Sequence, residues 1–225
     1  TPTFPDGSIA VADLDIDGGT DINAALVDAD LMIVDDGAGG TNRKATMARL
    51  ATYMGTKIGG GMEFIASSGA ISNAASVSFT GFDSSKYDHY EFFFMYLIPA
   101  TDDVELIAHA STDGGSNYDT TNGNYHVADQ TDVTGFQMTT AVIGSDTNEF
   151  GLSGQATLYG PHLTTYTYMK SSPILMHEAG AGRIDGTNDL VSVQVVAADV
   201  DAIQFKFLSG NIESGEITMF GIVNS

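Results

Sequence analysis

The distribution of apolar and polar positions divides the chain near GGG at 59–61. Beyond these glycines, apolar and polar residues alternate along short segments, which is typical of half-buried β-strands. The alternation is clearest in AIQFKFL at 202–208. The run YEFFFMYLI at 90–98 is apolar on both faces, as expected for a central strand.

Turn-forming sequences separate these segments, and no helical periodicity lies between them. The turn signals are PATDD, DGGSN, NGN, GSDTN, GAGRIDGTND and LSGNIESG. This spacing predicts about eight to ten strands. We therefore expect residues 59–225 to form an antiparallel β-sandwich of the jelly-roll type, in a protein that is mainly β.

Residues 1–58 follow a different pattern. TDINAALVDAD at 20–30 predicts a short helix with Asp21 as its N-cap, and LMIVDD at 31–36 predicts a short strand. TNRKATMARLATYMG at 41–55 predicts a second helix that ends at Gly55. Together these elements predict a small α/β segment ahead of the sandwich.

The second predicted helix carries one apolar stripe at helical spacing. The stripe consists of Met47, Leu50, Ala51 and Met54. Two short helices and one short strand bury little apolar surface by themselves. We therefore predict that residues 1–58 dock on another chain, with Met47, Leu50 and Met54 buried between the chains.

Charge changes the picture of possible partners. The formal net charge is −21, from 29 acidic and 8 basic residues, which disfavours nucleic acid and anionic lipid as partners. Half of the basic residues are close together in the sequence, namely Arg43, Lys44, Arg49 and Lys57. No apolar run of about twenty residues predicts a membrane span, and the absence of cysteine excludes disulfides. The sequence begins with Thr1 and shows no signal peptide, which leaves open a removed initiator or a fragment.

The stretch DLDIDGGTD at 13–21 matches the start of an EF-hand calcium loop at Asp13, Asp15, Asp17 and Gly18. The twelfth position of such a loop holds a glutamate, but here it is Ala24. We interpret the stretch as an acidic loop that leads into a helix. A weak Ca²⁺ site at the three aspartates is the alternative, and no other cofactor is predicted.

STDGGSNY at 111–118 resembles the Asp-box turn of sialidases and other β proteins through Ser111, Asp113, Gly115 and Tyr118. In that motif the aspartate satisfies turn amides and the aromatic ring packs beneath. We predict a structural role for these four residues, because sialidases also need an arginine cluster and only Arg183 lies in the predicted β region.

No catalytic constellation stands out. The five histidines show neither zinc-protease nor cupin spacing, and no G-x-S-x-G sequence occurs. Acidic pairs for glycoside hydrolysis are uninformative because carboxylates are abundant. Exposed tyrosines are candidates for stacking on sugar rings or for ordinary packing, namely Tyr118, Tyr125, Tyr166 and Tyr168.

The segment DIDGGTDINAALVDADLMIVDDGAGGTNRKATMARLATYM at 15–54 resembles one found near the start of many bacteriophage tail and virion structural proteins. Its elements are an acidic lead, an Ala-rich helix, D-L-x-x-V-D-D-G-A-G-G-T-N-R-K and a helix ending in tyrosine. FTGFDSSKYDHYEFFFMYLIPATDDVELIAHASTDGGSNYD at 79–119 and LSGNIESGEITMFGI at 208–222 resemble phage tail or fibre modules.

The resemblance implies a non-enzymatic virion component, made in the host cytoplasm and assembled into the extracellular particle. It implies a tail fibre or appendage that docks through residues 1–58 on other virion proteins, as a homotrimer, with no membrane insertion. Arg43 and Lys44 would then contact acidic residues, either Asp35 and Asp36 or the acidic lead at 13–17. The alternatives are a capsid decoration protein, a module that binds host-surface glycans, and a polysaccharide hydrolase.

Overall fold

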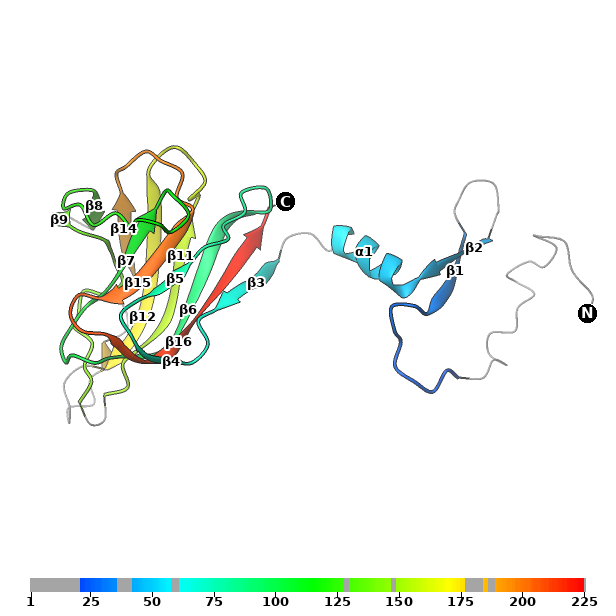
Figure 1. Cartoon of the computed structure of the whole chain (residues 1–225), viewed down its shortest axis with the longest axis horizontal. Helices are drawn as coiled ribbons and strands as arrows, with labels where there is room; N and C mark the ends of the chain where they lie inside the picture. The colour runs from blue at the N-terminus through cyan, green and yellow to red at the C-terminus, as the bar shows by residue number, and fades with distance from the viewer. Residues whose placement is uncertain are drawn as a thin grey trace, which may run out of the picture. The chain divides into compact units, whose positions relative to one another are not determined.

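The computed structural model describes residues 21–35, 42–57, 61–127, 130–146, 149–176, 184–185 and 189–224. The chain divides into two compact units, Thr1–Gly59 and Gly60–Ser225 (Figure 1). Each unit is described below by itself.

The first unit contains a β-hairpin that continues into a helix. Strands β1 (Leu31–Asp35) and β2 (Asn42–Thr46) pair antiparallel. Helix α1 (Met47–Lys57) follows β2 directly. The hydroxyl of Thr46 accepts a hydrogen bond from the backbone N–H of Arg49 at 3.3 Å, so Thr46 acts as the N-cap of α1.

The prediction of a helix at 20–30 is wrong, because the described part of this segment contains no helix. Asn23 has a left-handed backbone with φ of 50°, which a helix does not accommodate. The carbonyls of Asp28 and Asp30 accept hydrogen bonds from the N–H groups of Ala48 and Met47. The segment therefore satisfies the first amides of α1 instead of forming its own helical bonds.

The second predicted helix begins later than expected. Arg43 and Lys44 lie on β2, opposite Val34 and Ile33, and not at a helix N-terminus. Gly55 lies inside α1 and does not end it. The capping hydroxyl of Thr46 starts the helix, while the β1–β2 ladder holds the residues before it in an extended conformation.

The second unit is an antiparallel β-sandwich, which confirms the prediction of a mainly β protein with antiparallel sheets. One sheet has four strands in the order β10-β7-β15-β5. The other has ten strands, ordered β3-β16-β6-β11-β12-β14-β8-β9, with β13 pairing β12 and β4 pairing β16. The strands are β3 (Met62–Ser67), β4 (Ile71–Ala74), β5 (Val77–Phe79), β6 (Tyr87–Pro99), β7 (Leu106–Ser111), β8 (Tyr125–Val127), β9 (Gln130–Val133), β10 (Phe136–Gln137), β11 (Leu152–Tyr159), β12 (Thr167–Met176), β13 (Ile184–Asp185), β14 (Leu190–Gln194), β15 (Ala202–Phe207) and β16 (Ile212–Val223).

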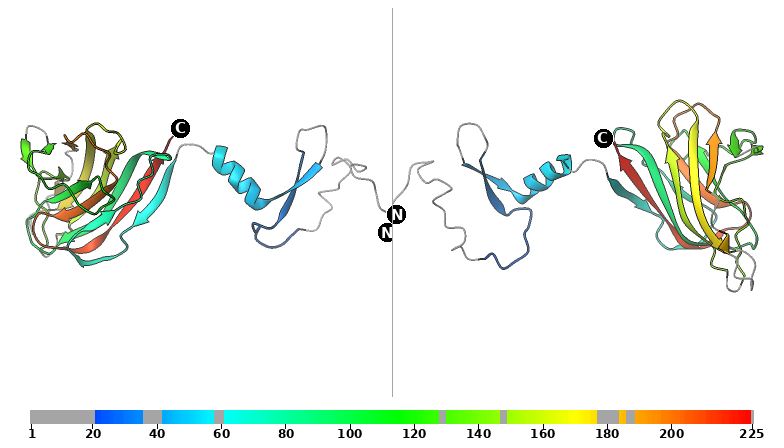
Figure 2. Two further views of the ribbon diagram at one scale, coloured as in Figure 1. Left: turned by 45° about the horizontal axis from the view of Figure 1, so that its top comes forward. Right: turned by 180° about the vertical axis from the view of Figure 1, so that it is seen from behind.

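The core lies between the two sheets (Figure 2). Phe205 of the smaller sheet contacts Phe92 and Phe94 of β6, with ring centroids 5.0 and 5.3 Å apart. Phe79 of β5 completes this cluster through contacts with Phe92 and Phe205. The apolar positions of the alternating sequence pattern thus meet across the sandwich and exclude water.

Side-chain hydrogen bonds join the edge of the smaller sheet to the larger one. The hydroxyl of Ser192 on β14 donates to the carbonyl of Gln137 and accepts from its N–H, at 3.2 and 3.1 Å. The buried hydroxyl of Ser171 on β12 donates to the carbonyl of Met138 at 2.8 Å. These bonds hold β10 and β14 together beside the site described next.

Candidate ligand-binding site

The turn after β7 is built around the two polar side chains of the S-x-D sequence. The hydroxyl of Ser111 donates to Asp113 Oδ1 at 2.9 Å and accepts from the N–H of Gly115 at 2.9 Å. Asp113 also accepts from Asn117, from the backbone N–H at 2.8 Å and from Nδ2 at 2.7 Å. The carboxylate therefore holds the turn closed.

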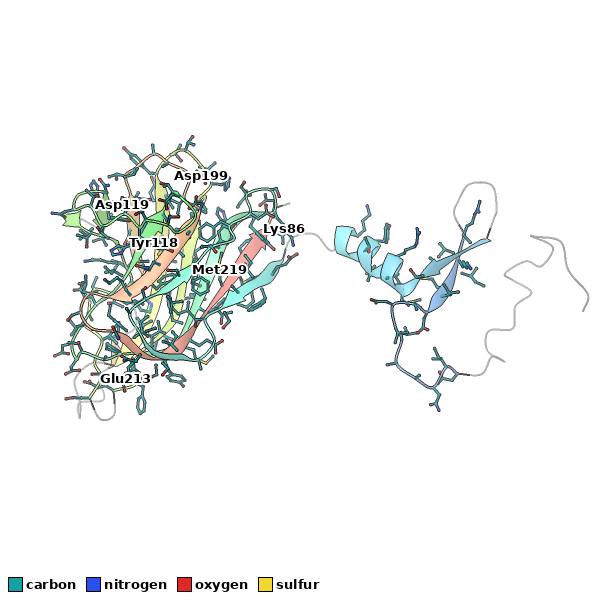
Figure 3. The ribbon with its side chains drawn as sticks, in the orientation of Figure 1. Lys86, Tyr118, Asp119, Asp199, Glu213 and Met219 are labelled. Atoms are coloured by element: carbon teal, nitrogen blue, oxygen red, sulfur yellow. The ribbon has the colours of Figure 1, made fainter. Side chains whose placement is uncertain are left out.

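Gly115 and Tyr118 complete the same turn. Gly115 has φ of +84°, and a Cβ added there would lie 2.9 Å from the hydroxyl of Tyr118. A larger residue would thus be strained and would displace the tyrosine. Tyr118 is half-buried, and Figure 3 shows it with Asp119 on the side of the sandwich that carries β7 and β8.

A cavity of about 330 Å³ lies beside this turn. Its size is within the range of small-molecule sites. Its walls combine carboxylates, amides and one aromatic ring, and no lysine or arginine is among the described residues that line it. The lining residues are Ala110, Ser111, Thr112, Asp113, Asn117, Tyr118, Asp119, Asn124, Gln194, Val196 and Ala198.

Both carboxylates of the cavity are stabilised in the ionised form. Hydrogen bonds from the side chain and backbone of Asn117 hold the pKa of Asp113 below its usual value. Burial raises the pKa of Asp119, but hydrogen bonds from Thr121, Asn124 and Gln194 outweigh it and lower the pKa. The site is therefore anionic and rich in hydrogen-bond acceptors at neutral pH.

Gln194 and Tyr125 form the buried support of the cavity. Gln194 is 1% exposed and donates through Nε2 to Asp119 Oδ2 at 3.1 Å. Its Oε1 is buried and has no hydrogen-bond partner in the part of the chain that the structure describes. Such an orphaned acceptor is costly in a folded protein, so a donor from a bound molecule or a water would stabilise it.

The hydroxyl of Tyr125 accepts a hydrogen bond from the N–H of Ala110 at 3.1 Å and donates to the carbonyl of Asp119 at 3.0 Å. Its ring packs edge-on against Phe136, and the residue is fully buried. Burial also raises the pKa of Tyr125. The suggestion that Tyr125 stacks on a sugar is therefore wrong, because its ring does not reach the surface.

Two other tyrosines named in the sequence analysis are exposed. Tyr166 and Tyr168, 50% and 48% exposed, line a second hollow of about 360 Å³ with Thr164, Thr165 and Ala197. None of the described residues that line this hollow is charged. It offers aromatic surface but few groups that would orient a ligand.

The predicted docking residues lie in the first unit, and none of them is fully buried. Arg43 and Lys44 are exposed on β2, and Met47 at the start of α1 is half-buried. Leu50 and Met54 are 36% and 43% exposed. Of the acids proposed to pair with the basic residues, Asp36 and those at 13–17 lie outside the described residues, as does the side chain of Asp35.

Three further findings concern metal ions, membranes and known proteins. Within the described residues, no group of three or more His, Cys, Asp or Glu side chains is placed to hold a metal ion, and the calcium alternative at Asp13, Asp15 and Asp17 lies outside them. Among the same residues, no helix has the length and apolarity needed to cross a membrane. No family model, curated protein or solved structure matches the chain.

Proposed function

We propose that this chain is a non-enzymatic structural protein of a bacteriophage virion, a tail fibre or appendage component that docks through residues 1–58. The exposure of large apolar side chains in the first unit carries this proposal. In the described part of this unit, nine of them are 36–65% exposed, whereas a folded unit buries most such residues. They are Ile22, Leu26, Val27, Leu31, Ile33, Val34, Leu50, Tyr53 and Met54.

Copies of the chain and other virion proteins are the proposed partners of this surface, with a homotrimer as the assembled form. Three chains would bring together the apolar side chains of three helices and three hairpins, which the described part of one unit leaves exposed. The basic residues Arg43 and Lys44 are exposed beside this surface on a chain of net charge −21. A carboxylate of this or a neighbouring chain is their proposed partner.

The order of strands supports a jelly-roll type for the displayed sandwich. Early and late strands pair in a nested series, with β3 beside β16, β5 beside β15, β6 beside β11 and β7 beside β10. A long hairpin rolled into two sheets produces this nesting. The unit is thus a compact module with both ends of the chain segment, β3 and β16, on neighbouring strands.

Charge substitutions on α1 test the docking proposal. In the full chain, Leu50→Glu combined with Met54→Glu would place two carboxylates on the apolar stripe, and we expect the oligomer to dissociate at least tenfold more readily. Thr52→Glu is the matched control, because Thr52 is exposed on α1 outside the stripe. Light scattering after size-exclusion chromatography measures the mass, and unchanged association of the double variant would refute docking through α1.

Recognition of a host-surface glycan is a second proposed function, favoured by the cavity at the Ser111–Tyr118 turn. Carboxylate and amide acceptors bind sugar hydroxyls, and the anionic character of the described lining disfavours acidic sugars. A glycan array with the full chain tests this. We expect neutral glycans to bind, and Asn124→Ala to weaken the signal while Tyr168→Ala leaves it unchanged. A blank array would count against the proposal.

The same cavity argues against a polysaccharide hydrolase. Glycoside hydrolysis needs a carboxylic acid with a raised pKa beside an ionised carboxylate. The pKa values of Asp113 and Asp119 are both lowered, so neither is suited to donate a proton at neutral pH. Incubation with host capsule polysaccharide tests this point, and depolymerisation that needs either aspartate would contradict the non-enzymatic proposal.

A further inference from the structure

Three phenylalanines form a continuous aromatic row on the outer face of the larger sheet. Phe64 of β3 contacts Phe220 of β16, with ring centroids 5.8 Å apart. Phe220 contacts Phe93 of β6 at 5.5 Å. The alternate residues Phe92 and Met219 point into the core, so the three rings face away from it.

A β-bulge in β6 adds two exposed side chains beside this row. The register with β11 passes from Phe94 opposite Gly154 to Leu97 opposite Leu152, so Met95 and Tyr96 share one place in the ladder. Both are displayed on the surface, at 58% and 60% exposure. Tyr96 has φ of 48°, an uncommon backbone conformation for a bulky residue.

These side chains form the outer aromatic patch. We define it as Met62, Phe64, Phe93, Met95, Tyr96 and Phe220. Met62 and Phe64 are 49% and 62% exposed, so the four most exposed members together present on the order of 450 Å² if each large residue has roughly 200 Å². A standard protein interface covers about 800 Å² on each partner, of which about 60% is apolar. The patch is thus large enough to form the apolar centre of such an interface.

The patch is uncharged on a strongly acidic chain. None of its six members carries a charge, although the chain has a net charge of −21. Three acids lie next to it in the described sheet. Glu91 accepts a hydrogen bond from the hydroxyl of Thr157 at 2.7 Å and Glu216 from the hydroxyl of Ser67 at 2.5 Å. Glu63, between Met62 and Phe64 on β3, forms an ion pair with Lys86. Identical acidic chains repel one another over most of their surface. Two copies therefore approach each other with the lowest electrostatic cost at an uncharged face such as this one.

We propose that the outer aromatic patch is a contact between copies of this chain, separate from the docking segment. The inference rests on the homo-oligomer proposed above and adds a second interface to it. Strand β3, which carries Met62 and Phe64, follows the docking segment directly in the sequence. Copies joined at residues 1–58 therefore hold their patches at high local concentration, which strengthens a contact too weak to form alone.

Two sets of variants of the full chain test the patch. Phe64→Glu combined with Met95→Glu places like charges across the contact. Tyr96→Gly removes one aromatic ring and relieves the left-handed backbone, so this variant is expected to fold at least as well as the wild type. Leu163→Glu is the matched control, because Leu163 is 48% exposed in the loop beside Asp88, at the opposite end of β6 from Met95.

Sedimentation equilibrium at micromolar concentration measures association, and circular dichroism checks that each variant is folded. We expect association to be at least tenfold weaker for the double variant and about threefold weaker for Tyr96→Gly. We expect it to be unchanged for Leu163→Glu. If both patch variants associate like the wild type while Leu50→Glu with Met54→Glu does not, the docking proposal stands and the patch has a different occupant. If only the patch variants dissociate, the patch proposal stands and docking through α1 fails.

Discussion

Replacing Tyr125 by phenylalanine tests how the cavity is supported. Strand β10 pairs with β7 only at Ala108 and Ile107. Beyond Ala108, β7 has no pairing with β10, so the backbone N–H of Ala110 on that side has no strand partner among the described residues. The hydroxyl of Tyr125 accepts that N–H and donates onward to the carbonyl of Asp119, so one hydroxyl ties β8, β7 and the loop wall together.

The expected cost follows from burial. Ala110 and Tyr125 are both fully buried, so water does not replace the lost hydroxyl in the variant. Leaving a buried donor unsatisfied costs about 1–3 kcal/mol, and we expect about 2 kcal/mol for Tyr125→Phe. For a unit of this size that corresponds to a fall in Tm of roughly 4–8 °C.

Urea unfolding followed by tyrosine fluorescence or circular dichroism gives the free energy of unfolding of the variant. Tyr168→Phe is the matched control, because Tyr168 is 48% exposed and its hydroxyl lies at the surface, where water replaces it. We expect this control to change stability by less than about 0.5 kcal/mol. If Tyr125→Phe is as stable as the wild type, Ala110 finds another acceptor and the described support of the cavity is incorrect.

Two further predictions concern the turn and the core. The pKa of Asp113 is lowered in the folded state, so its contribution to stability is full above its ordinary value of 3.8 and is lost as pH falls through the folded value. The stability difference between wild type and Asp113→Asn in urea unfolding should therefore shrink below that pH, and a pH-independent difference would contradict the bonding described for Asp113. Phe205→Ala should lower the free energy of unfolding by about 3–5 kcal/mol, because Phe205 is fully buried among Phe79, Phe92 and Phe94. A loss under about 1 kcal/mol would show that the core repacks around the gap.

The sandwich was predictable where one face of a strand is apolar and the other polar. The segment at 202–208 alternates cleanly and contains β15, and the apolar run at 90–98 lies within the central strand β6. Strand β12 does not show this apolar alternation, because its inward positions include Thr167 and Ser171, which are buried but polar. Ser171 is satisfied by the carbonyl of Met138, a distant partner that no local pattern reveals.

The elements of the first unit were harder to predict for a related reason. Helix propensity favoured a helix at 20–30. The carbonyls of Asp28 and Asp30 in this segment instead accept hydrogen bonds from the first amides of α1, which lie many residues further along the chain. The turn at Ser111 and Asp113 was recognised because its bonds are local. The cavity beside it was not, since Asn124 and Gln194 join it through the pairing of β8 with β14. Only the three-dimensional fold brings these amides to the turn.

The mass of the intact wild-type chain in solution tests the central proposal of assembly most directly. Native mass spectrometry at micromolar concentration should find a species of about 71 kDa, three times the chain mass of 23.6 kDa. An assembly of another size would revise the number of copies but keep the docking role of the exposed first unit. A single species at 23.6 kDa across this concentration range would contradict the account.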